Sequence, residues 1–237
     1  MTQTRLVEVR QNVLKQNDLL ARRLRNQFIA AGVDVISLVS SPGAGKTMLL
    51  EKLLTKLHLE CRVAALVGDL ATENDAARLA RSEAPVKQIV TGTVCHLDAE
   101  MIERALADWN LNDLDILFIE NVGNLVCPSS YDLGEATRLV LMSVTEGEDK
   151  PLKYPTIFNT ADVAVITKMD LAEAVEFDLE AARQNIQSVR PGIKILEVSA
   201  KTGEGVAALL EFLRPQPALA VNAGRIVLSK PPALAGR

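Results

Sequence analysis

The sequence predicts an α/β fold in which a mostly parallel sheet carries helices on both faces. Short apolar runs suited to strands alternate with amphipathic stretches suited to helices along most of the chain. One such run, VDVISLV (33–39), is almost continuously apolar, which is typical of a strand buried on both faces. Strands separated by helices form right-handed β-α-β units, and such units build a parallel sheet.

The first expected element is an amphipathic helix over 5–31, which ends at Gly32. We expect a helix (1–32) packed on one domain (33–213), then a disordered tail (214–237) that has four prolines and no helical period. The expected strands are 33–39, 62–68, 86–91, 115–122, 136–144, 161–168 and 193–199. The expected helices between and after them are 47–57, 73–83, 98–109, 173–189 and 204–213.

The composition excludes several classes of protein. Of the 237 residues, 48% are apolar, which is enough for a sizeable core, and 26 basic against 30 acidic residues give a net charge of -4. A nucleic-acid binder is usually basic and often rich in aromatic residues, which are only 3% here. No apolar run approaches the roughly 18 residues of a membrane span, and residues 1–27 do not resemble a secretory signal. We therefore expect a cytoplasmic protein that binds no nucleic acid and does not insert into membranes.

The segment SSPGAGKT (40–47) lies between the first strand of the domain and the helix that follows, as the phosphate-binding loop of P-loop NTPases does. Its glycines let backbone N–H groups turn toward phosphates, and the helix N-terminus adds a partial positive charge. Lys46 is expected to reach the terminal phosphates, and the Thr47 hydroxyl to ligate Mg²⁺. Ser40 stands where the motif usually has its first glycine. The expected nucleotide contacts of this loop are Ser41, Gly43, Ala44, Gly45, Lys46, Thr47 and Met48.

Two acidic residues end buried strands where the phosphates should lie. Asp69 lies at the end of the second strand and Glu120 near the end of the fourth, and carboxylates at such places suit Mg²⁺. The alternative is that both acids only cap the following helix or turn. Gly123 can offer its N–H to the terminal phosphate. We take Lys46, Asp69 and Glu120 as the catalytic residues, and we expect slow intrinsic turnover because no water-positioning glutamine or arginine finger is evident.

Two segments after the last two strands predict a guanine pocket. TKMD (167–170) supplies Thr167 and Lys168, and its Asp170 carboxylate can accept from both N–H donors of guanine, which adenine does not present. Thr167 replaces the usual asparagine of this motif. The second segment is SAK, which supplies Ser199, Ala200 and Lys201. Together with the phosphate loop they favour GTP and GDP over ATP as the ligand.

Three soft ligands form a candidate transition-metal site. Cys95 and His96 are adjacent and Cys127 lies 32 residues further along. Thiolate and imidazole suit nickel, zinc or copper, and a second chain or water would complete the shell. The alternative is that these cysteines are small buried apolar groups, as we expect for Cys61.

With these residues identified, the chain resembles the HypB family, the GTPases that incorporate nickel during hydrogenase maturation. The resemblance covers roughly residues 17–213. It is carried by SSPGAGKT (40–47), GDLATENDA (68–76), TGTVCHLDA (91–99), FIENVGNLVCP (118–128), SVTEGEDKPLKYP (143–155), TKMDL (167–171) and VSAKTGEG (198–205).

The resemblance implies a Mg²⁺-dependent GTPase that dimerises with nucleotide and delivers Ni²⁺ to a nickel–iron hydrogenase large-subunit precursor, together with other maturation factors such as a HypA-like nickel chaperone. It implies that Cys95, His96 and Cys127 bind nickel, or zinc, at the dimer interface. In the proline-containing loop EGEDKPLKYP (146–155), we expect Lys153 to reach the nucleotide of the partner subunit; the alternative is that this loop is only a solvated connection. The alternatives are a urease-type accessory GTPase, whose Cys-Pro-His motif is missing here, a nucleotide-dependent scaffold without metal, and a small-molecule kinase.

Overall fold

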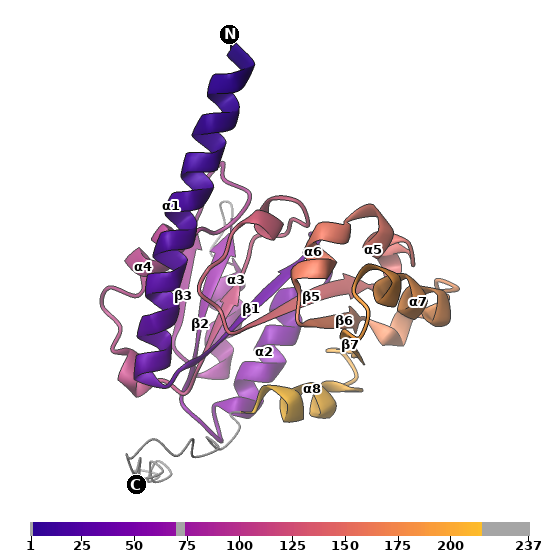
Figure 1. Ribbon diagram of the computed structural model, residues 1–237. Helices are drawn as coiled ribbons and strands as arrows, with labels where there is room; N and C mark the ends of the chain where they lie inside the picture. The colour runs from indigo at the N-terminus through magenta and orange to yellow at the C-terminus, as the bar shows by residue number, and fades with distance from the viewer. Residues whose placement is uncertain (1, 70–73, 215–237) are drawn as a thin grey trace, which may run out of the picture.

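The computed structural model describes residues 2–69 and 74–214, and the described residues form one parallel sheet between two layers of helices (Figure 1). Seven strands of the described part are hydrogen-bonded in the order β3-β2-β4-β1-β5-β6-β7. They are β1 (Asp34–Ser40), β2 (Val63–Asp69), β3 (Val86–Val90), β4 (Ile116–Glu120), β5 (Thr137–Ser143), β6 (Val163–Thr167) and β7 (Lys194–Glu197). The predicted α/β fold is therefore confirmed, and the predicted tail beyond Arg214 lies outside the described residues.

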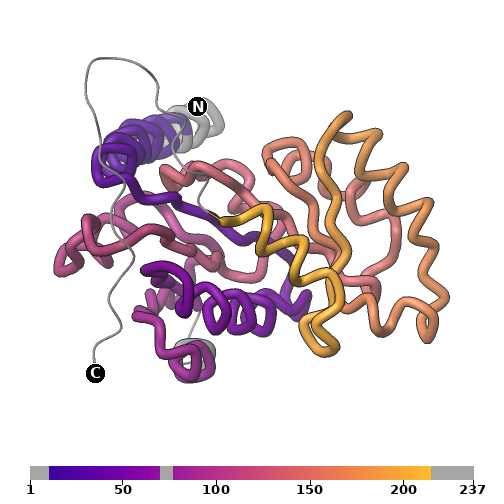
Figure 2. Tube along the Cα trace, turned by 90° about the horizontal axis from the view of Figure 1, so that it is seen from below, coloured from indigo at the N-terminus to yellow at the C-terminus, as the bar shows by residue number. Residues whose placement is uncertain are grey.

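Helices cover both faces of the sheet. Figure 2 shows the sheet lying between α1 on one side and α2 on the other. The helices are α1 (Thr2–Ala31), α2 (Lys46–Leu57), α3 (Asn74–Leu79), α4 (Ala99–Ala105), α5 (Lys150–Lys153), α6 (Pro155–Thr160), α7 (Leu179–Val189) and α8 (Val206–Leu213).

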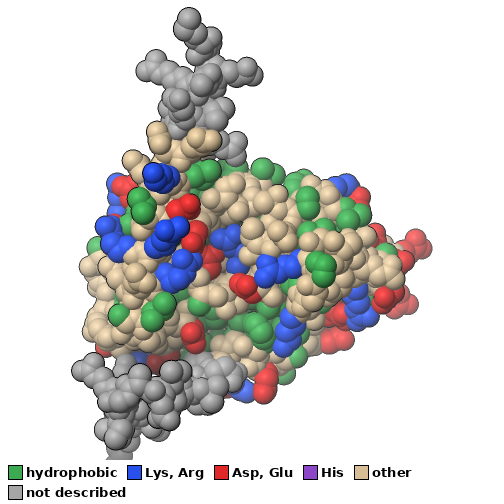
Figure 3. Space-filling model, in the orientation of Figure 1, with side chains coloured by type: hydrophobic (Ala, Val, Ile, Leu, Met, Phe, Trp, Pro, Cys, Tyr) green, Lys and Arg blue, Asp and Glu red, His purple; other side chains and the backbone are tan. Residues whose placement is uncertain are grey.

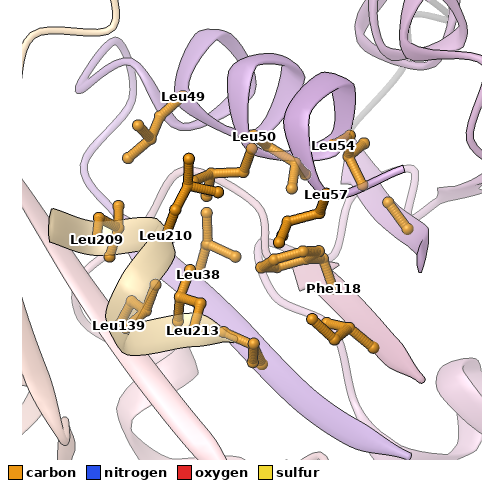
Figure 4. Packing of buried hydrophobic residues seen from close by; sticks show 14 of the residues in the cluster. Leu38, Leu49, Leu50, Leu54, Leu57, Phe118, Leu139, Leu209, Leu210 and Leu213 are labelled. Carbon is orange, nitrogen blue, oxygen red and sulfur yellow. The ribbon is translucent and has the colours of Figure 1, made fainter. Parts of the chain in front are cut away.

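Alternate residues of each strand enter different cores, as the pleat of a strand requires. On β1, Ile36 and Leu38 point toward α2 and α8, where the leucines of both helices close over Phe118 (Figure 4). Val35, which precedes Ile36, points to the opposite face of the sheet and packs with Leu24 and Phe28 of α1. This burial on both faces explains why the strand runs are almost continuously apolar.

Two predicted helix boundaries are wrong, and a polar cap explains the first of them. The helix predicted over 173–189 begins only at Leu179, because the Asp178 side chain caps it and Glu176 has a left-handed φ of 52°. The helix predicted over 98–109 ends at Ala105, because the following N–H groups of Ala107 and Trp109 bond three residues back, to Arg104 and Leu106, instead of four.

The segment predicted as a proline-containing loop (146–155) is also largely helical. Pro151 lies in the first turn of α5 and Pro155 in the first turn of α6. Proline suits the first turn of a helix because its missing N–H would have no intrahelical partner there. In this segment the prolines therefore start helices instead of marking a loop.

The surface in the view of Figure 3 mixes both signs of charge. Basic side chains lie along α1 and over the centre of this face, and acidic side chains gather toward the α7 end. No helix in the described ranges is both long enough and apolar enough to span a membrane.

The order of the strands fixes where a ligand can bind. β1 has β4 on one side and β5 on the other, both parallel to it, so the connections diverge at β1. In open parallel sheets the crevice beyond the carboxyl ends of the strands at such a point is the usual ligand site. The phosphate loop, Asp69 and Glu120 all follow strand ends at this edge.

Candidate functional site

The phosphate loop turns sharply between β1 and α2. Gly43 and Gly45 have φ values of 74° and 92°, a region that residues with side chains rarely adopt. The Lys46 ammonium donates to the Ser40 hydroxyl over 2.9 Å, and both side chains are buried. The serine that replaces the first glycine of the motif therefore has a defined role, because it holds the phosphate-binding lysine.

The predicted magnesium ligands meet in this crevice. The Thr47 hydroxyl donates to Oε1 of Glu120 over 2.8 Å, and Asp69 lies at the end of the neighbouring strand, β2. The following loop touches the phosphate loop directly, since a Cβ on Gly123 would lie 2.8 Å from Cα of Pro42. The chain after Glu120 is therefore in direct contact with the phosphate loop.

The predicted base pocket is tied to the phosphate loop. The Thr167 hydroxyl donates to the carbonyl oxygen of Ala44 over 2.7 Å, so threonine makes a link between the two motifs. Lys168 has a left-handed φ of 59°, a strained conformation often found at functional sites. The Asp170 carboxylate accepts from the Ser199 hydroxyl over 2.6 Å, and the Lys201 ammonium lies 3.9 Å from its other oxygen.

One cavity of about 620 Å³ connects these parts. Its size suits a nucleotide, since ligand pockets usually enclose about 300–1,000 Å³. The predicted residues that line it are Gly43, Ala44, Gly45, Lys46, Thr47, Met48, Asp69, Glu120, Gly123, Thr167, Lys168, Asp170, Ala200 and Lys201. Ser41 and Ser199 do not line it, and Ser199 instead orients Asp170 from behind.

The three soft side chains come together at the same edge of the sheet. Among the described residues, Cys95, His96 and Cys127 form a group whose ligand atoms lie within 4.8 Å of one another. The two sulfur atoms are 3.1 Å apart. Burial lowers the pKa of the His96 imidazole, against the charge of Asp98, so the ring is neutral near pH 7 and has a lone pair for a metal.

The His96 ring packs against an aromatic side chain, but one of its nitrogen atoms has no hydrogen-bond partner in the part of the chain that the structure describes. Its Nδ1 is buried and has no hydrogen-bond partner among the described residues, while the ring stacks on Tyr131 with centroids 3.9 Å apart. A half-buried imidazole that has an unpartnered nitrogen and lies near two sulfur atoms fits a thiophilic metal better than it fits a packed core.

Comparison with known proteins identifies the family. Residues 34–197 match the family model described as CobW/HypB/UreG, nucleotide-binding domain. The chain is 45% identical over 216 residues to the hydrogenase maturation factor HypB of Azotobacter chroococcum mcd 1, covering 91% of this chain and 71% of that relative. It is 47% identical over 216 residues to HypB of Escherichia coli (strain K12), with coverage of 91% and 74%. The chain belongs to the HypB family of hydrogenase maturation factors.

A solved structure agrees with this assignment. The crystal structure of HypB from Helicobacter pylori in complex with nickel superposes with a TM-score of 0.79 at 42% identity, covering 84% of this chain and 93% of that one. The resemblance found in the sequence is thereby confirmed, as is the P-loop NTPase fold. That relative binds nickel, and the matched domain of this chain is a nucleotide-binding domain.

Within this HypB-family chain, long-range hydrogen bonds hold the two loops that carry the soft ligands. The Asn17 amide on α1 donates to the Asp132 carbonyl and accepts from the Ala99 N–H, both over 2.9 Å. These two partners follow the Cys127 loop and the Cys95–His96 loop, respectively. A single buried side chain from the N-terminal helix therefore joins both loops.

A buried ion pair supports the chain that follows Cys127. Arg138 lies 2.6 Å from Glu135, with side chains only 10% and 6% exposed. Glu135 also accepts from the Ser37 hydroxyl, and Arg138 donates to the Tyr131 carbonyl over 3.0 Å. This network fixes Tyr131, whose ring covers His96.

Eight of the described residues that line the nucleotide cavity were not predicted from the sequence: Pro42, Leu49, Gly68, Arg78, Asn121, Val122, Leu171 and Val198. Besides Ser41 and Ser199, the predicted residue Lys153 also lies outside the cavity. Arg78 and Asn121 line the cavity, and the Arg78 Nε donates to Glu51 over 2.8 Å. Asn121 lies in the segment FIENVGNLVCP (118–128), and its position directly after Glu120 is the sequence signal that could have identified it. Lys153 is on exposed α5, paired with Asp149 over 2.6 Å, and does not line the cavity of its own chain.

Proposed function

We propose that this chain is a Mg²⁺-dependent GTPase that binds nickel and delivers it during maturation of nickel–iron hydrogenase. The observation that carries the proposal is the segment after β4. Glu120 lies in the nucleotide cavity, and Cys127, seven positions later, lies beside Cys95 and His96. One short stretch of chain thus belongs to both sites.

The choice of GTP rests on Asp170. Its carboxylate is oriented by Ser199 and faces the cavity beside Lys168 and Ala200. Two guanine N–H groups can donate to such a carboxylate in addition to the Ser199 hydroxyl, whereas adenine offers no such pair of donors and would leave these acceptor positions unfilled. Unpaired buried groups cost far more than a missing contact, so the pocket discriminates strongly.

Thr47, Asp69 and Glu120 would hold Mg²⁺, directly or through water, because all three present oxygen ligands at the cavity. When bound, the ion would neutralise charge on the phosphates of the nucleotide. Lys46 and the backbone of the phosphate loop orient those phosphates. None of the described lining residues is a glutamine. We therefore expect intrinsic turnover on the order of a few per hour to a few per minute, measured in a single-turnover assay.

Nickel would be held by Cys95, His96 and Cys127 as cargo, with zinc as a competing ion. Two sulfur atoms and a neutral imidazole nitrogen within 4.8 Å suit either metal. Three ligands leave the shell incomplete, so a second copy of the chain or water completes it. In this proposal GTP drives formation of a cytoplasmic homodimer, Lys153 reaches the partner's nucleotide, and the nickel passes between a HypA-like chaperone and the hydrogenase large-subunit precursor.

Nucleotide state would control nickel affinity. Gly123 packs on the phosphate loop, and closure of residues 120–127 on GTP moves Cys127 relative to Cys95 and His96. A displacement of about one ångström is enough to weaken a metal site. GTP and GDP must therefore differ in their effect on nickel binding.

The test is a titration of Ni²⁺ and Zn²⁺ into metal-free protein with GDP and with a non-hydrolysable GTP analogue. We expect different nickel affinities in the two states, and loss of binding in Cys127→Ala but not in the matched Cys61→Ala variant. Equal affinities in both states would contradict the proposal, because a ligand with no differential interaction shifts no equilibrium. A parallel competition of ATP against GTP separates this function from a kinase.

A further inference from the structure

Asn121 connects the end of β4 to the loop that carries Cys95 and His96. It follows Glu120 directly, lines the nucleotide cavity, and is only 2% exposed. Its Oδ1 accepts from the backbone N–H of Leu97 over 3.0 Å and from that of Val122 over 2.9 Å. One oxygen atom therefore joins the chain after the magnesium ligand to the residue after His96.

Leu97 is also fixed from the side of β2. Its side chain is fully buried, and a Cβ on Gly68 would lie 2.8 Å from Leu97 Cγ. Gly68 directly precedes Asp69. Leu97 therefore contacts the ends of both β2 and β4, the two strands that carry Asp69 and Glu120.

The far end of the same loop is held by a different element. The Ala99 N–H donates to the Asn17 side chain on α1, which does not line the nucleotide cavity. Cys95 and His96 therefore lie on a short segment whose far end is attached to α1 and whose Leu97 is attached to the nucleotide cavity.

We propose that Asn121 transmits the state of the bound nucleotide to Cys95 and His96. This inference rests on the proposed function. When residues 120–123 adjust to the terminal phosphate, the Oδ1 atom moves with them and the Leu97 N–H follows. His96 then shifts against Ala99, which Asn17 holds in place. Both halves of the metal site move with the nucleotide, Cys127 through its own loop and Cys95–His96 through Asn121.

The experiment measures the ratio of nickel affinities in the GTP-analogue and GDP states for the full chain and for Asn121→Ala. Coupling between two sites typically amounts to about 5–150-fold, and we expect Asn121→Ala to bring the ratio within about twofold of one. Asn121→Asp keeps the accepting oxygen and should restore the ratio. Cys61→Ala is the control, because Cys61 belongs neither to the cluster nor to the nucleotide cavity, and it should leave the ratio unchanged. Asn17→Ala removes the fixed point at Ala99, so it should weaken nickel binding and also lower the ratio.

A wild-type ratio in Asn121→Ala, or a ratio near one in Asn121→Asp, would overturn the inference. If Asn121→Ala binds no nickel in either state, amide hydrogen exchange on the unmodified chain decides. The Leu97 and Val122 amides should change protection together when GDP is replaced by the GTP analogue, and an unchanged Leu97 amide would overturn the inference. A ratio of one in the unmodified chain would instead defeat the proposed function itself.

Discussion

The nucleotide cavity and the thiol–imidazole cluster lie at the same edge of the sheet but are built in different ways. The residues of the cavity stand within a few positions of a strand end or a helix start, and glycines with positive φ give the phosphate loop its shape. The cluster lies on two loops that are held by side chains from distant segments, such as Asn17, whose partner Asp132 is 115 residues away. The motifs of the first site are therefore shaped by local geometry and then joined by a few bonds such as Thr167 to Ala44. The ligands of the second site are held instead through supporting side chains that are distant in the sequence.

The largest expected effect is in the locally built site. Asp170→Asn replaces an acceptor for two guanine donors with a group that presents only one accepting oxygen. One guanine donor loses its acceptor and the other loses the charge on its acceptor. Two hydrogen bonds to a charged group, at about 1.5–3 kcal/mol each, are therefore affected, and GDP affinity should fall about 10²- to 10⁴-fold. Calorimetry with Mg²⁺ present measures it.

The same variant should accept xanthine nucleotides, because xanthine offers a carbonyl to the new amide. Nickel affinity without nucleotide should stay within about twofold, since Asp170 does not contact the cluster. Retention of full GDP affinity would show that the base pocket is not at TKMD.

The next largest effect is expected on the stability of the protein, from the buried Arg138–Glu135 pair that supports the thiol–imidazole cluster. Arg138→Met leaves Glu135 charged and buried, and removal of one partner of a buried pair costs about 3–5 kcal/mol of unfolding free energy. Urea denaturation checks this. Arg23→Met is the matched control, because the Arg23–Glu103 pair has a similar distance of 2.6 Å but side chains 60% and 38% exposed. It should cost less than about 1 kcal/mol. Equal losses in the two variants would mean that the buried network is not a support.

Cys127→Ala removes a ligand of the cluster without touching the cavity. We expect nickel affinity to fall by at least about 100-fold, the upper range for loss of a residue that only supports a ligand. GDP affinity should change by less than about twofold, as for a distant site. Nickel competition with a chromophoric chelator measures the first and calorimetry the second. An unchanged nickel affinity would place the metal elsewhere.

The smallest effect is expected at Cys61. Burial raises the pKa of its thiol to about 11, with the nearby carboxylates of Asp115 and Glu60 adding to the shift. The thiolate is the reactive form, so Cys61 should alkylate slowly at pH 7–8 and faster as the pH approaches 11. Mass spectrometry after iodoacetamide treatment should show that nickel protects Cys95 and Cys127 and leaves the rate at Cys61 unchanged. Nickel protection of Cys61 would contradict its role as a core residue.

The same contrast explains how much the sequence could predict. The strands, the phosphate loop and the base pocket follow from apolar runs and from motifs whose residues lie next to one another. The sequence also named Cys95, His96 and Cys127, but spacing alone left metal binding and core packing open, because their approach depends on Asn17, Asn121 and Glu135. None of these three is next to Cys95, His96 or Cys127 in the sequence. The short helices at 150–160 were missed because proline is as common in loops as in first turns of helices.

The most direct test of the coupling between the two sites is the reciprocal measurement. The affinities for GDP and for a non-hydrolysable GTP analogue are determined by calorimetry with Mg²⁺, in the presence and in the absence of saturating nickel. Linkage requires that nickel changes the ratio of these two affinities by the same factor by which the nucleotide changes nickel affinity. We expect that factor to differ from one and to agree between the two experiments. Identical nucleotide affinities with and without nickel would show that the two sites share a sheet edge but not a function.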